Sequence, residues 1–169
     1  EQPLHLAQRV AELITPEQVA RDRMLDVIGG SAGALLGLLA LFDATHDPAV
    51  LERAWLCADR LLASREVHDG AYRTWRAIER RPLTGFAHGA AGIAYALLRL
   101  HAHSPDAAFV AAAQDAITYE DHTFDAGAGN WPDFRTHEGV EGPVFLANWC
   151  HGAAGITLAR VSALDVLDT

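Results

Sequence analysis

Cysteine is scarce in this sequence, where Cys57 and Cys150 are the only two among 169 residues. Two cysteines cannot build the disulfide framework of a small secreted domain, so a reducing, cytoplasmic location is expected, with Cys57 as a small apolar core residue. Long hydrophobic stretches are missing too. The longest apolar run, from Ala32 to Phe42, is about half of the ~20 residues that a bilayer crossing needs, which predicts a protein without a membrane span.

Basic residues are also few. The chain has 13 Lys and Arg against 22 Asp and Glu, a formal net charge of −9. No cluster of basic residues is present to neutralise phosphates, so nucleic acid is disfavoured as a partner, whereas peptides and small molecules remain open. Half of the residues are hydrophobic and only 21% are charged, which excludes intrinsic disorder and allows one domain with its own core.

A Gly-x-x-Gly tetrad occurs three times, at Gly30–Gly33, Gly89–Gly92 and Gly152–Gly155, with spacings of 59 and 63 residues. Each tetrad is followed by an apolar run rich in Leu and Ala, which are good helix formers. Each tetrad is therefore expected to open a helix. A period of this length indicates a repeated structural unit.

Further helices are expected between the tetrads, at about 48–66 and 106–119, and a shorter one at about 4–14. The sequence thus predicts an all-α fold in which helical hairpins repeat and form an (α/α) barrel or toroid. The long loops at 67–87 and 120–148 are candidates for functional segments. The repeat divides the chain into three units, near residues 1–45, 46–103 and 104–169.

The residues just before the tetrads are the candidate site residues. When the tetrads are aligned, these residues read Asp26-Val-Ile-Gly29, Gly85-Phe-Ala-His88 and Asn148-Trp-Cys-His151. An aspartate, a cysteine and two histidines would then meet at one rim. Each has an ordinary alternative, as a helix-start acid, a buried thiol or a capping histidine, and the glycines alone could serve only close packing. Recurrence at matched positions favours a site.

These motifs resemble the lanthionine synthetase C-like (LanC-like) cyclases. The closer resemblance is to the C-terminal cyclase domain of the class II (LanM-type) lanthipeptide synthetases. The motifs that carry it span almost the whole chain, at residues 26–33, 84–93, 119–120 with 129–135, and 148–156.

The resemblance implies a double-layered toroid of seven helical hairpins, of which residues 1–169 would supply about three, as the N-terminal part of the cyclase domain. It implies addition of peptide Cys thiols to dehydroalanine or dehydrobutyrine, which forms (methyl)lanthionine thioether rings in a dehydrated precursor peptide. His88 would be a catalytic acid or base, Asp26 a catalytic residue that orients either His88 or a zinc-bound group, and Cys150 one of three Zn²⁺ ligands. The other two ligands would belong to a second, later Cys-His-Gly motif, which this sequence lacks. The position of His151 is variable in the family and is not a ligand position.

Two expectations follow for the chain by itself. It should be inactive, because one Cys ligand rarely suffices for tight zinc binding. It should associate with itself or with the missing part of the synthetase, because open hairpin edges expose apolar surface. The alternative is a non-catalytic LanC-like module that binds a peptide or a thiol without metal. A glycan-processing (α/α) barrel is disfavoured, since only Asp26 offers a carboxylate at a tetrad.

Overall fold

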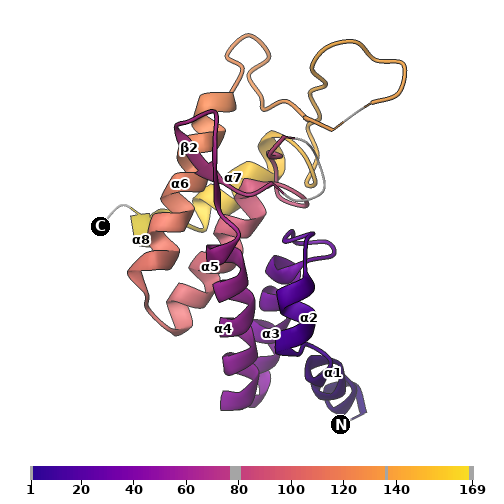
Figure 1. Ribbon diagram of the computed structural model, residues 1–169, viewed down its shortest axis with the longest axis vertical. Helices are drawn as coiled ribbons and strands as arrows, with labels where there is room; N and C mark the ends of the chain where they lie inside the picture. Colours follow the sequence, from indigo (N-terminus) through magenta and orange to yellow (C-terminus); the bar gives the residue numbers. More distant parts are fainter. Residues whose placement is uncertain (1, 77–80, 136, 168–169) are drawn as a thin grey trace.

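Helices make up most of the chain in this computed structural model, which describes residues 2–76, 81–135 and 137–167 (Figure 1). The all-α prediction is confirmed. In the described residues the helices are α1 (Gln2–Glu12), α2 (Pro16–Arg21), α3 (Ser31–Thr45), α4 (Pro48–Ala63), α5 (Ala90–His103), α6 (Ala107–Thr123), α7 (Ala153–Val161) and α8 (Leu164–Leu167).

Each tetrad opens a helix, as predicted. Gly30, Gly89 and Gly152 are the N-cap residues of α3, α5 and α7. These three helices form a row in which α5 packs against α3 on one side and α7 on the other. In the two complete hairpins, α4 packs on α3 and α6 packs on α5.

The outer helices begin at residues that cap them. The Asp47 side chain accepts a hydrogen bond from the Ala49 N–H at the start of α4, and the Asp106 side chain accepts one from the Ala108 N–H at the start of α6. Carboxylates at this position satisfy amide groups that have no partner inside the helix. The expected helix starts near 48 and 106 are therefore correct.

Several helix ends differ from the prediction. Helix α6 continues to Thr123 rather than ending near 119, and α1 ends at Glu12 rather than near 14. Helix α4 ends at Ala63 rather than near 66, and there the Ser64 hydroxyl donates to the Arg60 carbonyl. The third apolar run is interrupted after α7, where the Ser162 hydroxyl donates to the Leu158 carbonyl. A serine that bonds back in this way competes with the helical hydrogen bond.

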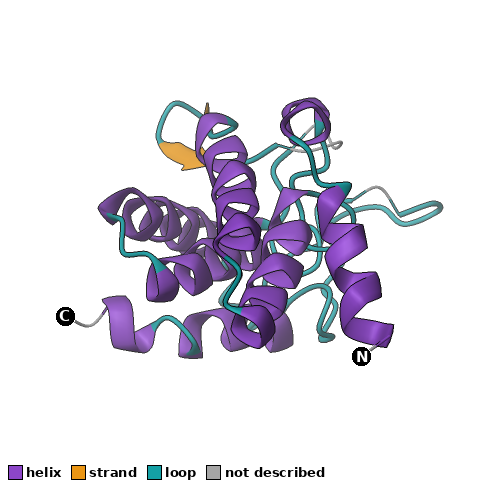
Figure 2. Ribbon diagram, turned by 90° about the horizontal axis from the view of Figure 1, so that it is seen from below, coloured by secondary structure: helices purple, strands orange, loops and turns teal. Residues whose placement is uncertain are grey.

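The predicted loop 67–87 contains a β-hairpin. Strand β1 (Glu66–His68) pairs antiparallel with β2 (Tyr72–Thr74), and Glu66 lies opposite Thr74. The hairpin packs against α6 and lies at one edge of the molecule (Figure 2).

The core lies between the two complete hairpins. Leu35 and Leu38 of α3, Leu97 of α5 and Phe109 of α6 are among its fully buried side chains. Cys57 on α4 is also fully buried, and burial raises the pKa of its thiol to about 12, so it is a core residue as expected.

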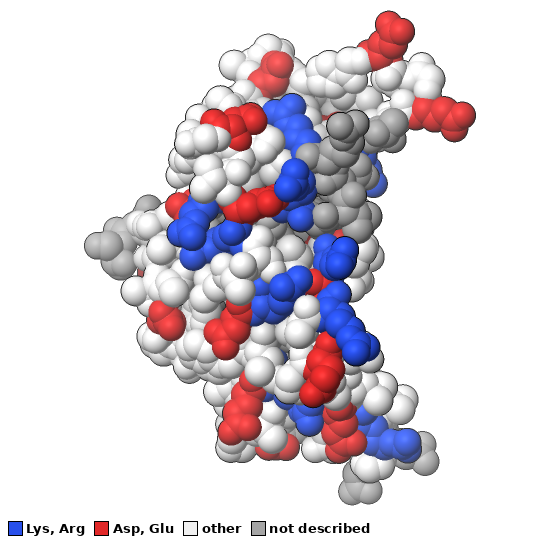
Figure 3. All heavy atoms as spheres, viewed as in Figure 1, with Lys and Arg blue, Asp and Glu red and all other residues white. Residues whose placement is uncertain are grey.

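The surface is mixed in charge, with acidic and basic side chains side by side on the face of Figure 3. Helix α1 and the residue that follows it expose large apolar side chains, and Leu6, Val10 and Leu13 are each more than half exposed. Among the helices described, none has the length and apolar character to cross a bilayer.

Candidate active site

The last glycine of each tetrad is required by close backbone packing. A Cβ atom on Gly33, Gly92 or Gly155 would lie 2.0, 1.9 or 2.1 Å from the carbonyl oxygen six residues earlier. Real Cβ atoms do not come that close to a backbone atom, so each turn folds tightly onto the first turn of its own helix only with glycine there. Close packing, which the sequence left open as the ordinary role, therefore holds for all three.

Backbone hydrogen bonds join the three turns to one another. The Val27 N–H donates to the Ala87 carbonyl at 3.1 Å, and the Ala87 N–H donates to the Cys150 carbonyl at 3.2 Å. Segments about sixty residues apart are thereby fixed side by side. The turn that carries His88 is the middle one and contacts both of its neighbours.

Asp26 and His88 form the central pair. His88 Nδ1 lies 2.7 Å from Asp26 Oδ2, and the Asp26 side chain is 2% exposed while that of His88 is 27% exposed. Because a carboxylate can only accept, Nδ1 carries the proton, which leaves Nε2 as the other ring nitrogen available for proton exchange. The second Asp26 oxygen accepts from the Gly29 N–H at 2.8 Å and fixes the carboxylate within its turn.

The third turn adds His151 to this pair. Its ring stacks on that of His88, with centroids 5.7 Å apart and planes 20° from parallel. His151 is 4% exposed, and its Nδ1 atom is 3.9 Å from Asp133 Oδ2, too far for a hydrogen bond. Burial lowers the pKa of His151, although the nearby Asp133 carboxylate opposes that effect.

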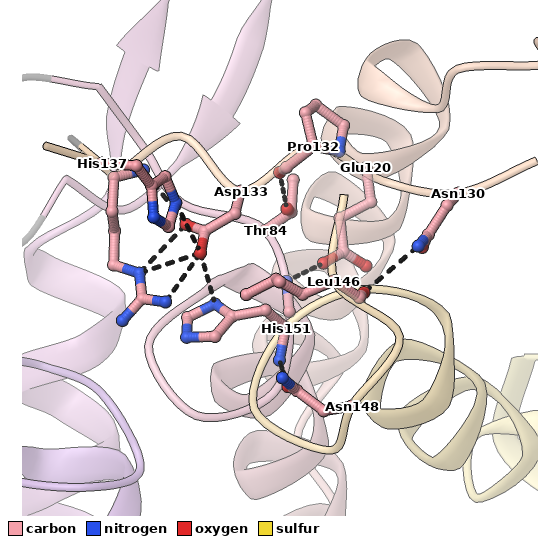
Figure 4. A network of polar contacts seen from close by, with 11 residues as sticks. Thr84, Glu120, Asn130, Pro132, Asp133, His137, Leu146, Asn148 and His151 are labelled. Atoms are coloured by element: carbon pink, nitrogen blue, oxygen red, sulfur yellow. Dashed lines mark hydrogen bonds and ion pairs between the residues drawn. The ribbon is translucent and has the colours of Figure 1, made fainter. Parts of the chain in front are cut away.

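Asp133 organises a second set of polar contacts, seen in Figure 4. Its buried carboxylate accepts bidentate hydrogen bonds from the Arg135 guanidinium at 2.7–3.1 Å. His137 Nε2 lies 3.2 Å from Asp133 Oδ2. Burial alone would raise the pKa of Asp133, but the hydrogen bonds from Arg135 and the charge of His151 outweigh it, and the pKa is lowered. Asp133 thus organises the loop around itself and places its carboxylate 3.9 Å from His151 Nδ1.

Asn130 holds the same loop against α7. Its Oδ1 atom accepts from the Ala153 N–H at 2.8 Å, and its Nδ2 group donates to the Leu146 carbonyl at 3.1 Å. Gly152, the N-cap of α7, has no side chain with which to satisfy that N–H. Asn130 therefore caps α7 from a different part of the chain.

Asp133 and Asn130 were not predicted individually, although both lie in the Gly129–Arg135 motif. Nothing in the sixty-residue repeat corresponds to them. Their signal in the sequence was the turn-rich composition of a long loop, which points to a segment rather than to particular side chains.

Cys150 is a free, partly exposed cysteine in the third turn. No three His, Cys, Asp or Glu side chains within 2–76, 81–135 and 137–167 are grouped so that they could hold a metal ion. A catalytic zinc needs three protein ligands. The described residues offer Cys150 alone at the predicted ligand positions, so they do not by themselves fit a zinc ion.

The fold and the site define an all-α protein in which Gly-rich turns bring the Asp26–His88 pair, Cys150 and His151 to the starts of neighbouring helices. Over residues 3–169 the chain matches the family model described as lanthionine synthetase C-like protein. It belongs to the lanthionine synthetase C-like family, as its motifs predicted. A comparison with curated proteins gave no match.

Proposed function

We propose that this chain is part of a lanthionine synthetase-type cyclase that acts on a dehydrated precursor peptide. The observation that carries the proposal is the 2.7 Å contact between His88 and the buried Asp26. Membership of the lanthionine synthetase C-like family suggests the class of reaction. The Asp26–His88 pair offers the proton transfer that this reaction needs.

The reaction forms one C–S bond and moves one proton. A peptide Cys thiol loses its proton, its sulfur bonds to the β-carbon of dehydroalanine or dehydrobutyrine, and the electron pair of the C=C bond becomes an enolate. His88 Nε2 accepts the proton of the thiol, and the resulting imidazolium delivers it to the α-carbon, so that no proton is gained or lost overall. Asp26 holds the ring with Nδ1 protonated and stabilises the cationic imidazole. These steps involve only His88, Asp26 and the substrate.

We further propose that the domain is of the LanM type and that residues 1–169 form its N-terminal part. One of the three expected zinc-ligand positions, Cys150, falls in this sequence, and the second Cys-His-Gly motif does not. Zinc would supply a Lewis acid for the substrate thiol once the other two ligands are present. By itself, the 169-residue chain is expected to be inactive.

The test uses a dehydrated peptide with one Cys and one dehydroalanine. Cyclisation leaves the mass unchanged, so ring formation is followed as loss of thiol alkylation in the mass spectrum. The complete domain should close the ring, and the 169-residue chain should leave the thiol free. Ring closure by the chain alone would refute the need for further ligands, and an inactive complete domain would refute the cyclase function.

A non-catalytic module that binds a thiol or peptide is the second candidate, and the single ligand position favours it. It predicts that a Cys-containing peptide binds the chain equally well with and without a metal chelator. A cyclase fragment that depends on zinc predicts weak binding in both conditions. Isothermal titration calorimetry separates the two.

A further inference from the structure

Glu120 is a fully buried carboxyl group for which the proposed reaction has no use. It lies near the end of α6, and its residue is 1% exposed. Its Oε1 atom accepts a hydrogen bond from the Gly85 N–H at 3.2 Å. Gly85 begins the turn that carries His88, so Glu120 reaches from an outer helix to that turn. Figure 4 shows the Glu120 side chain beside Thr84, the residue before Gly85.

The first and third turns have a side-chain hydrogen bond that the middle turn cannot have. Asp26 Oδ1 accepts from the Gly29 N–H, and Asn148 Oδ1 accepts from the His151 N–H, each at 2.8 Å and three residues apart. Such bonds hold a turn closed with its own first side chain. The matched residue of the middle turn is Gly85, which has no side chain to do this.

Gly85 cannot be replaced by a residue that would anchor the turn from within. Its φ is +99°, and a Cβ atom there would lie 2.8 Å from the Cys150 carbonyl oxygen. The close approach of the two turns therefore requires glycine. Residue 85 cannot bond the His88 N–H as Asp26 and Asn148 bond the Gly29 and His151 N–H groups, and Glu120 holds the turn at a different amide, that of Gly85 itself. Glu120 is the side chain that bonds the Gly85 N–H.

The neighbouring contacts hold the segment before Gly85 but do not replace this bond. The Tyr119 hydroxyl donates to the Pro82 carbonyl at 2.7 Å, and the Thr84 hydroxyl donates to the Pro132 carbonyl at 2.8 Å. Both fix residues that precede the turn. Glu120 fixes the point at which the turn starts.

The surroundings of Glu120 leave its carboxyl group poorly solvated. Arg160 on α7 lies 3.9 Å from Oε2, Tyr95 on α5 and Arg160 line a small cavity beside it, and Asp121 is its neighbour on α6. Burial raises the pKa of Glu120 to about 7, although hydrogen bonds from the Gly85 and Ala91 N–H groups and the charge of Arg160 oppose that rise.

We propose that Glu120 is a positioning residue that holds the Gly85 turn and thereby sets the place of His88 against Asp26. The catalytic part of this inference rests on the proposed function, whereas the positioning itself does not. In this role the hydrogen-bond acceptor matters and the charge does not. Glutamine should therefore serve as well as glutamate, and a side chain of similar size without an acceptor should not.

The test compares Glu120→Gln with Glu120→Leu, and uses Asp115→Asn on the same helix as a control for charge. The first readout is the His88 Nδ1–H resonance in the NMR spectrum of the chain, which is observable because its hydrogen bond slows exchange with water. We expect Glu120→Leu to lose or shift that resonance, and Glu120→Gln and Asp115→Asn to keep it. An unchanged resonance in Glu120→Leu would overturn the proposal.

A second measurement keeps the test decisive if Glu120→Leu does not fold. In the wild-type chain the Gly85 amide ¹⁵N shift should titrate with a midpoint near the pKa of Glu120, about 7, and Glu120→Gln should abolish that titration. A Gly85 amide that does not respond to pH would contradict the contact on which the proposal depends.

A cyclase assay distinguishes the positioning role of Glu120 from the proposed cyclase function. In the complete domain, Glu120→Leu should lower kcat by about tenfold or more with KM little changed, because a displaced catalytic group mainly affects the chemical step, and Glu120→Gln should restore it. If no thioether forms in any sample but the NMR results are as expected, the positioning stands and the proposed function fails. Full activity in Glu120→Leu would refute the positioning alone.

Discussion

Glu120 should make a distinct contribution to the pH dependence of the free energy of unfolding, which a comparison of the wild type with Glu120→Gln isolates. The pKa of this carboxyl group rises from its ordinary 4.5 to about 7 in the folded chain because the group is buried. Each pH unit corresponds to about 1.4 kcal/mol, so ionised Glu120 costs the folded chain about 3 kcal/mol relative to the unfolded chain.

The pH dependence that Glu120 gives to the free energy of unfolding has the opposite sign to that of a salt-bridged carboxylate. The contribution of Glu120 is fully present below about pH 4.5, where the group is neutral in both states, and is lost as the pH rises through about 7. Glu120→Gln has the same shape as the neutral acid and does not titrate. Its stability relative to the wild type should therefore increase by about 3 kcal/mol between pH 4.5 and pH 8.

Thermal unfolding followed by circular dichroism measures this difference. For a chain of this size, about 3 kcal/mol corresponds to a relative Tm gain of roughly 6–12 °C at pH 8. Asp115→Asn, which removes a partly exposed carboxylate from the same helix, controls for the change in net charge. Parallel Tm curves for wild type and Glu120→Gln across this pH range would refute the reasoning.

Three further predictions concern packing, metal binding and assembly. Gly155→Ala should destabilise the fold by about 1–3 kcal/mol, because the new Cβ atom would lie 2.1 Å from a carbonyl oxygen. Gly37→Ala in α3 should stabilise it by about 0.4–1 kcal/mol, because a Cβ atom there meets nothing within 4 Å. Equal effects of the two variants in urea titrations would show that backbone packing is not the cause. The purified chain should bind zinc weakly and lose that binding in Cys150→Ala, and tight stoichiometric zinc by elemental analysis would count against an incomplete site. Light scattering should find a dimer or a larger assembly, since Leu6 and Val10 on α1 and Leu13 just after it expose apolar surface, and a clean monomer would argue against self-association.

The sequence predicted the helices well because their signals are local. Leu- and Ala-rich runs after each tetrad, and Asp-Pro or Pro-Asp pairs before the outer helices, mark starts that depend on neighbouring residues. The hairpin at Glu66–Thr74 was missed although Asp69-Gly70, both with positive φ, is a recognised hairpin signal. The strands flanking it are only three residues each, too short for a periodic pattern to be evident.

The candidate site was only partly predictable. Asp26, His88, Cys150 and His151 could be chosen because they occupy related positions in a repeat, and the structure brings the turns that carry them together. Asp133 and Glu120 act on those turns from outside the repeat. A contact of that kind depends on how a loop and an outer helix pack, and one sequence contains no local pattern that specifies it.

The Asp26–His88 pair is proposed to transfer the proton in thioether formation, and the proposed function depends most on this step. The direct measurement is the rate of thiol loss catalysed by the complete domain with Asp26→Asn or His88→Gln, with His103→Gln at the C-terminal end of α5 as control. General acid–base catalysis predicts a fall of about 10²- to 10⁴-fold in both variants and none in the control. Wild-type rates in folded Asp26→Asn and His88→Gln would contradict the central claim.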